Sequence, residues 1–92
     1  MARRTRRKHS MVVVAQELVR YLLAHPGASD TAEGIARWWF ESEDGVSPLE
    51  LTKALDHLVA VGLIEASSAG DGRVRYRRRA GAAALRAFLR AA

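Results

Sequence analysis

The chain lacks cysteine and any long apolar run, and both absences narrow its class. With no cysteine among its 92 residues, it can form neither disulfide bonds nor a zinc site built on thiolates. No apolar run approaches the ~20 residues that a membrane-spanning helix needs. The short apolar stretch at residues 11–15 ends at Gln16 and Glu17, and no signal-peptide cleavage pattern follows it. We therefore expect a soluble, cytoplasmic protein without a membrane partner.

Catalytic and ligand-binding motifs are missing as well. His9, His25 and His57 are far apart in the sequence, and none is spaced from a carboxylate as in a metal-binding motif. The segment Gly70-Asp71-Gly72 has the composition of a turn, and no helix follows it directly as in a phosphate-binding loop. We therefore predict that the protein is not an enzyme and has no catalytic residue, no metal ion and no cofactor.

Negative charge is absent from both ends of the chain. Residues 1–10 contain five basic residues, residues 73–92 contain seven, and neither segment has an acidic residue. Residues 11–72 hold all ten acidic residues and only three basic ones. A surface that serves solubility mixes the two signs, whereas concentrated positive charge is typical of surfaces that bind polyanions. The distribution favours nucleic-acid binding over a basic surface that only contacts solvent.

Apolar residues at helical spacing predict four helices in one small domain. Ser10 is expected to cap the first helix, and the segments Asp30–Glu33 and Ser47–Glu50 have the pattern of capping boxes for the second and third. Gly62 is expected to end the third helix. The predicted helices cover about residues 11–24, 31–40, 48–61 and 80–90.

The same spacing predicts which side chains form the core. Only one of two adjacent tryptophans on a helix can face inward, so we assign Trp39 to the core and leave Trp38 partly exposed. Trp38 is then either half-buried under a loop or a contact for a partner or a base. The other expected core residues are Ile35, Phe40, Leu51, Leu55, Leu58 and Val59. Apolar residues also recur at helical spacing on the first helix, at Met11, Val14, Leu18, Tyr21 and Leu22, and on one side of the last helix, at Leu85, Phe88 and Leu89.

A β-hairpin is predicted between the third and fourth helices. Residues 63–67 and 73–78 read as strands, joined by a turn at residues 69–72. Side chains of a strand alternate between its two faces, so one face is cationic and the other carries Val74 and Tyr76. The arginines expected on the cationic face are Arg73, Arg75, Arg77 and Arg79. The predicted fold class is α+β and mostly helical.

The element order and the joining residues resemble a known superfamily. The stretch LTKALDHLVAVGLIEA followed by GRVRYRRRAG resembles the recognition helix, the Gly-Leu-Ile junction and the wing of winged helix-turn-helix regulators of the MarR, ArsR and PadR type. The resemblance covers about residues 11–92 and implies a winged helix-turn-helix domain with three helices, a β-hairpin wing and a C-terminal helix. Residues 1–10 would form a basic disordered arm in front of it.

The resemblance also implies which residues contact DNA. In winged-helix proteins the third helix lies in the major groove and the wing contacts the phosphates. The outward residues Glu50 and Asp56 make this third helix less cationic than most, so we expect the wing and the arm to carry most of the phosphate contacts. The predicted DNA-binding residues are Arg3, Arg4, Arg6, Arg7, Thr52, Lys53, His57, Arg73, Arg75, Arg77 and Arg79.

Several interpretations stay open at this level. The main one is a small transcriptional regulator that binds double-stranded DNA as a homodimer through its first and last helices. The arginine strand could instead be a solvated edge strand whose charges prevent aggregation, and the arm a plain tail. The protein could also be an interaction module that binds a protein partner through Trp38 and residues 41–50, or a protein that binds structured RNA. The apolar residues expected at the dimer contact are Val13, Val19, Leu85, Phe88 and Leu89.

Overall fold

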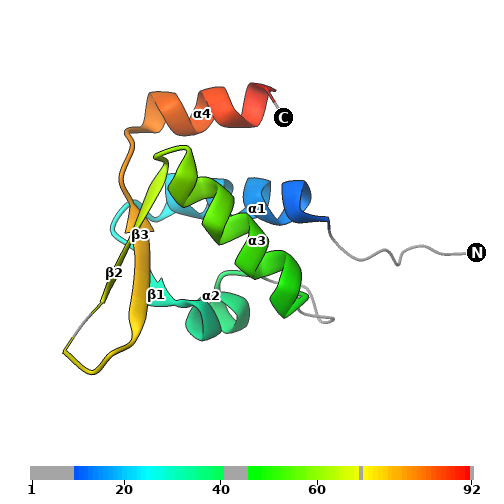
Figure 1. Ribbon diagram of the computed structural model, residues 1–92. Helices are drawn as coiled ribbons and strands as arrows, with labels where there is room; N and C mark the ends of the chain where they lie inside the picture. Colours follow the sequence, from blue (N-terminus) through cyan, green and yellow to red (C-terminus); the bar gives the residue numbers. More distant parts are fainter. Residues whose placement is uncertain (1–9, 41–45, 69, 92) are drawn as a thin grey trace, which may run out of the picture.

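The computed structural model describes residues 10–40, 46–68 and 70–91. Within them the chain forms four helices and three strands, which confirms the α+β class (Figure 1). The predicted arm and the acidic residues 41–45 lie outside the described residues. No helix in the described part of the chain is both long and apolar enough to cross a bilayer. The elements are α1 (Met11–Ala24), β1 (Ser29–Thr31), α2 (Ala32–Trp38), α3 (Pro48–Ala60), β2 (Ile64–Ser68), β3 (Val74–Arg78) and α4 (Ala82–Ala91).

Side-chain caps begin three of the helices. As predicted, the Ser10 hydroxyl accepts a hydrogen bond from the Val13 amide in α1, and the Ser47 hydroxyl accepts one from the Glu50 amide in α3, each at 3.4 Å. The capping box predicted at Asp30 is wrong by one residue. Thr31 caps α2 by accepting from the Gly34 amide at 3.2 Å.

Asp30 does not cap α2 because it belongs to β1. It pairs with Tyr76 of β3, and its carboxylate accepts a hydrogen bond from the Thr31 amide at 2.7 Å. The carboxylate also occupies the space beside Gly34, where a Cβ atom would lie only 2.0 Å from it. Glycine at this position therefore lets α2 start directly after the strand.

Gly62 ends α3, as predicted, and turns the chain into β2. Its φ of 83° lies in the left-handed region that favours glycine. The Leu63 amide donates to the Leu58 carbonyl at 3.0 Å, and the Gly62 amide donates to the Val59 carbonyl at 3.1 Å. These two bonds form a Schellman motif, which satisfies carbonyls that the last helical turn leaves free. The helix and the strand are thus joined with almost no intervening loop.

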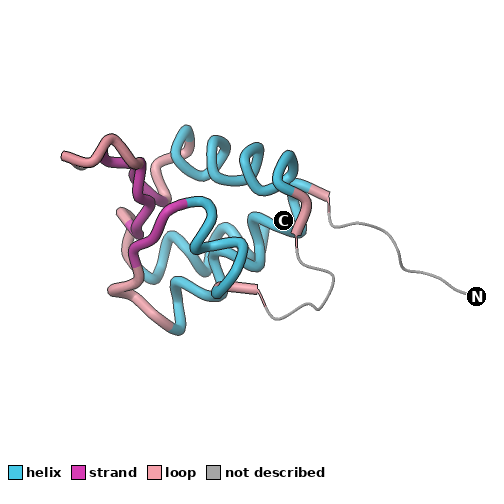
Figure 2. The backbone as a smooth tube through the Cα atoms, turned by 90° about the horizontal axis from the view of Figure 1, so that it is seen from below, coloured by secondary structure: helices cyan, strands magenta, loops and turns pink. Residues whose placement is uncertain are grey.

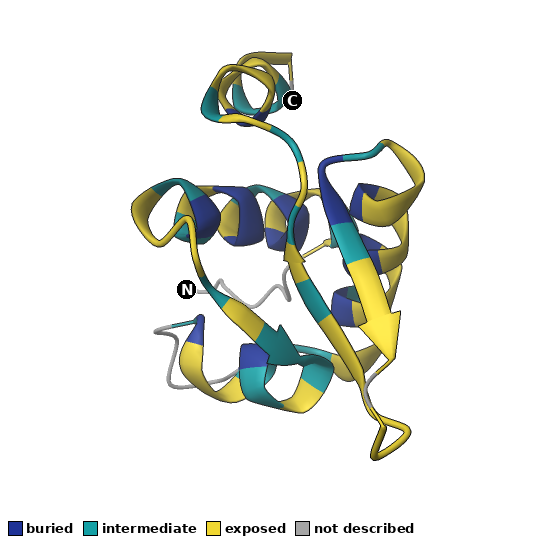
Figure 3. Ribbon diagram, turned by 90° about the vertical axis from the view of Figure 1, so that its left-hand side faces the viewer, coloured by how far each residue is buried: buried dark blue, intermediate teal, exposed yellow. Residues whose placement is uncertain are grey.

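The three strands form one antiparallel sheet in the order β1-β3-β2. The helices lie on one side of this sheet, and the end of the hairpin between β2 and β3 projects beyond them (Figures 1 and 2). The strand β1 was not predicted, and it places β3 in the middle of the sheet (Figure 3). The interpretation of the arginine strand as an edge strand is therefore wrong.

One core joins the helices to the inner face of the sheet. The predicted residues Val14, Leu18 and Leu22 of α1 and Trp39 after α2 are buried. Val59 was expected there but is 36% exposed, and the smaller Ala54 takes the inward position on α3. The other predicted core residues that are buried are Ile35, Leu51, Leu55 and Leu58, and Phe40 is partly buried. Leu85 of α4 is buried in the same core, while Met11, Tyr21, Phe88 and Leu89 are partly buried against it.

Burial in the core also removes two residues from the predicted dimer contact. Val19 and Leu85 are each 0% exposed within a single chain. They pack against the same cluster as the rest of α1 and α3. A partner chain cannot reach either side chain without opening the domain, so their assignment to a dimer interface is wrong.

Candidate nucleic-acid interface

The outer face of the sheet carries the arginines of β3. Arg75 lies opposite Ser67 of β2 and Thr31 of β1, and Arg77 lies opposite Glu65 and Ser29. Directly paired residues of antiparallel strands project to the same side of the sheet. Tyr76 points to the other side and is half-buried against the core. The predicted alternation is confirmed for these residues, and the arginines face away from the helices.

Two further arginines flank β3. Arg73 precedes the strand and Arg79 follows it, and both are exposed. The Arg79 amide still donates to the Leu63 carbonyl at 2.9 Å, so the paired backbone continues past the strand end. Arg78 has the opposite orientation, because it pairs with the buried residue Ile64 and is half-buried. We call the exposed set Arg73, Arg75, Arg77 and Arg79 the arginine face.

The apolar face of the hairpin is shorter than predicted. Tyr76 contacts the core, but Val74 is 40% exposed. The reason is that the distal end of the hairpin extends beyond the helices (Figure 2), which leaves Val74 exposed. The projecting end is therefore exposed on both of its faces.

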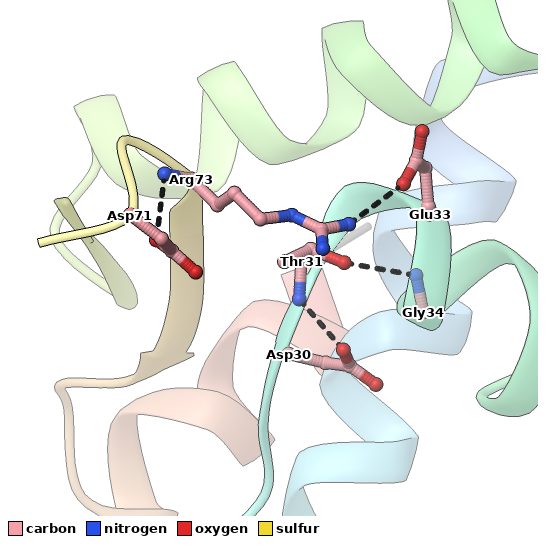
Figure 4. Close-up of polar contacts among 6 residues, drawn as sticks. All are labelled: Asp30, Thr31, Glu33, Gly34, Asp71 and Arg73. Carbon is pink, nitrogen blue, oxygen red and sulfur yellow. Dashed lines mark hydrogen bonds and ion pairs between the residues drawn. The ribbon is translucent and has the colours of Figure 1, made fainter. Parts of the chain in front are cut away.

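Arg73 is held at two points, as Figure 4 shows. Its backbone amide donates to the Asp71 carboxylate at 2.9 Å within the hairpin turn. Its guanidinium Nη2 lies 3.0 Å from Oε1 of Glu33, in the first turn of α2. This ion pair links the projecting hairpin to α2 across 40 residues of sequence. Sequence reasoning had assigned Glu33 to a capping box instead.

A second carboxylate pairs with Arg77. Glu65 lies directly opposite it on β2, and the Arg77 Nε donates to Glu65 Oε2 at 2.5 Å. By contrast, Arg75 and Arg79 make no ion pair with any residue that the structure describes. The neighbours of Arg75 in the register are the hydroxyl residues Ser67 and Thr31. Two of the four arginines of this face are therefore paired with carboxylates, and the other two are not paired with any described carboxylate.

The predicted contacts on α3 do not form a comparable surface. Thr52 and Lys53 are exposed, but Lys53 Nζ lies 3.9 Å from the Glu50 carboxylate. His57 lies toward α4, where its ring centroid is 6.2 Å from that of Phe88. It lines an apolar groove of about 240 Å³ between α1, α3 and α4. The exposed side of α3 thus has little net positive charge.

The arginine face and α3 also point in different directions. The helices α1 and α3 lie behind the inner face of the sheet, while α4 packs against α1 beyond the end of the sheet (Figures 1 and 3). Arg75 and Arg77 lie on the opposite, uncovered side. Arg73 is the member tied to a helix, through Glu33 of α2. A ligand held flat on the sheet would therefore meet arginines and would not meet the exposed side of α3.

An aromatic cluster occupies another surface. The Tyr21 ring stacks on Trp39 with centroids 4.5 Å apart and lies 4.3 Å from the His25 ring. The neighbouring Trp38 is 69% exposed, so the interpretation that it is half-buried under a loop is wrong. With Glu17 and Arg20, these rings line a pocket of about 340 Å³. Their spacing on two separate helices gave no signal of this stack in the sequence.

The remaining predicted DNA contacts are the four arginines of the arm. The arm residues Arg3, Arg4, Arg6 and Arg7 lie outside the described residues. Within the part of the chain that the structure describes, no group of three or more His, Asp or Glu side chains is placed to hold a metal ion. No protein-family model, curated protein or solved structure matches the chain. Functional inference therefore rests on the geometry and charge of the described residues.

Proposed function

We propose that the protein binds double-stranded DNA and acts as a small transcriptional regulator with a winged-helix domain. The observation that carries this proposal is the arginine face on the central strand of an exposed sheet. The element order and the sheet order β1-β3-β2 are compatible with a winged-helix arrangement, in which the hairpin of β2 and β3 is the wing. The protein then holds the phosphate backbone chiefly with its wing.

The strand geometry suits a row of phosphates. Alternate residues of a strand are about 6.7 Å apart. Consecutive phosphates of one DNA strand wind around the axis, so they are farther apart than the ~3.4 Å by which each step rises. Neighbouring arginines can therefore contact neighbouring phosphates of one strand. The planar guanidinium fork forms paired hydrogen bonds with phosphate oxygens. These contacts position a duplex without reading its sequence.

The same face argues for contacts to the backbone rather than to bases. Binding of single strands relies on aromatic rings on which the bases stack. Among the described residues of the sheet, the one aromatic side chain is Tyr76, which faces the core. A duplex, whose bases are already stacked, is therefore the better ligand. We further propose that the arm with Arg3, Arg4, Arg6 and Arg7 follows a groove, while Thr52, Lys53 and His57 make secondary contacts.

A homodimer through α1 and α4 remains part of the proposal, on a smaller set of residues than the sequence indicated. Val13 is 39% exposed, and Phe88 and Leu89 are only partly buried. The apolar groove between α1, α3 and α4 adjoins Phe88. Burying such apolar surface is the main favourable term in association. Sedimentation at increasing protein concentration measures this step directly.

The salt dependence of DNA binding tests the role of the sheet. Replacing Arg75 and Arg79 with alanine should reduce the slope of log K against log salt by about 1.8 units, because two phosphate contacts are lost. Arg86 and Arg90, two exposed arginines of α4, provide a control with the same loss of charge. Equal slopes for the two double variants would refute the assignment to the sheet.

One observation favours a second function. Trp38 is 69% exposed beside the pocket formed by Tyr21, Trp39 and their neighbours. Exposed tryptophans are enriched at protein interfaces. The protein would then be an interaction module that uses Trp38 and the acidic segment at 41–50. In that case Trp38→Ala abolishes regulation while the affinity for DNA stays unchanged.

A further inference from the structure

The two carboxylates that contact the arginine face have no place in a simple phosphate-binding surface. Glu33 and Glu65 are acidic, and each lies against an arginine that could otherwise bind a phosphate. They come from different elements, α2 and β2. A carboxylate offers a guanidinium the same paired oxygen acceptors as a phosphate. Each glutamate carboxylate therefore lies beside the guanidinium of its arginine in a position that a phosphate could take.

Both pairs are exposed enough to exchange partners. The side chains of Arg73 and Glu33 are 56% and 83% exposed, and those of Arg77 and Glu65 are 62% and 36% exposed. Ion pairs in such positions contribute little stability because water screens the charges. A phosphate brought close to either arginine can therefore replace the carboxylate. The glutamates therefore weaken anion binding by the arginine face without preventing it.

We propose that Glu33 and Glu65 determine which anions the arginine face accepts. Within the arginine face of the free protein, Arg75 and Arg79 are the members that make no ion pair with a described residue and are open to an incoming anion. An isolated phosphate engages these and lacks the further contacts needed to displace a carboxylate. A continuous phosphate backbone bound at Arg75 lies within reach of Arg73 and Arg77. Its phosphates then replace the carboxylates of Glu33 and Glu65 on these two arginines. The inference rests on the proposed binding of DNA and adds a preference for long polyanions over single phosphates.

The two glutamates differ in how much they weaken binding. Glu33 lies on the first turn of α2, and its side chain is free to swing into solvent once Arg73 leaves it. Glu65 is fixed opposite Arg77 in the sheet. After the exchange it remains beside the bound phosphate, and the two like charges repel each other. Removal of the Glu65 charge should therefore strengthen binding more than removal of the Glu33 charge.

The matched test uses the variants Glu33→Gln, Glu65→Gln and the double variant. Glutamine keeps the size of the side chain and removes its charge. Glu17→Gln is the control, because Glu17 pairs with Arg20 on α1 at 3.2 Å and adds the same unit of net charge when replaced. Affinity for a duplex is measured against salt, and affinity for inorganic phosphate is measured in parallel.

The expected result is tighter duplex binding than in Glu17→Gln, by up to about fivefold for Glu65→Gln and less for Glu33→Gln. In the double variant the salt slope should stay close to that of the wild type, because the duplex contacts the same four arginines in both proteins. Inorganic phosphate should bind the double variant measurably better than it binds the wild type. The ratio of the affinity for the duplex to the affinity for inorganic phosphate is then smaller in the double variant than in the wild type.

Two outcomes would overturn the role of the glutamates while leaving DNA binding intact. One is weaker duplex binding by the variants, which would mean that the carboxylates orient the arginines for binding. The other is binding that equals that of Glu17→Gln. If neither the wild type nor the double variant binds a duplex, both proposals fail. If only the double variant binds, the carboxylates block the arginine face and the proposed function of the wild type fails.

Discussion

The arginine face and the exposed side of α3 are joined through Gly62, yet they carry different chemistry. The sheet presents four exposed arginines, two of them paired with carboxylates. The helix presents Lys53 next to Glu50, with Asp56 exposed on the following turn. Both regions depend on one core but face different sides of it. The difference shows that a cationic hairpin beside a helix does not by itself make the helix a DNA reader.

The largest effect expected from a single change is on the core that holds the two regions together. Leu55 of α3 is 1% exposed in the cluster that includes Ile64 of β2. Leu55→Ala should lower the free energy of unfolding by about 2–5 kcal/mol, because it leaves a cavity between helix and sheet. Denaturant unfolding measures this loss.

Leu49→Ala is the matched control for this change. Leu49 lies on the same helix but is 61% exposed, so the same substitution should change stability by less than about 0.5 kcal/mol. If Leu55→Ala melted α3 while the sheet stayed folded, the two regions would not share one cooperative core. Probes on each region, read in the same titration, distinguish these cases.

A smaller effect is expected at the junction between the two regions. Gly62 has a φ of 83°, and the side chain of an alanine there would be strained. Gly62→Ala should lower the free energy of unfolding by about 1–2 kcal/mol. Gly27→Ala in the turn after α1 is the control, since its φ lies outside the left-handed region and a Cβ atom there meets no atom within 4 Å. An equal loss in both variants would contradict the role of the Schellman motif.

The smallest effect is expected from the exposed side of α3. Replacing Thr52, Lys53 and His57 together with alanine should shallow the salt slope of DNA binding by at most about 0.9 units, because only Lys53 carries a permanent positive charge. The preference for one duplex sequence over a scrambled one should hardly change. A loss of that preference would show that α3 contacts bases. The helix would then provide sequence specificity, while the sheet provides phosphate contacts.

Features set by neighbouring residues could be predicted from the sequence. The alternation of Arg75, Tyr76 and Arg77 follows from the period of a strand and needs no knowledge of its partners. The caps at Ser10 and Ser47 and the end of α3 at Gly62 depend on a few adjacent residues, and all three predictions are confirmed. Local patterns therefore recovered the order of the helices and the hairpin.

Features set by distant residues could not be predicted. The strand β1 consists of Ser29, Asp30 and Thr31, which lack the pattern of a strand, and it exists because β3 offers it a pairing edge. The pairing of Glu65 with Arg77 depends on the register of the hairpin, which a change of one residue in the turn would alter. The pairing of Glu33 with Arg73 depends on how α2 packs beside the hairpin.

The central position of β3 has a consequence for the thermodynamics of binding. Its backbone is hydrogen-bonded to a strand on each side, so its amide protons should exchange slowly with solvent even though the arginine side chains are open to it. Binding at β3 then orders no backbone of this strand and restricts only its side-chain rotamers, each at about 2 kcal/mol or less. The arginines stand on a preorganised support, which lowers the entropic cost of association compared with the same residues in a free loop.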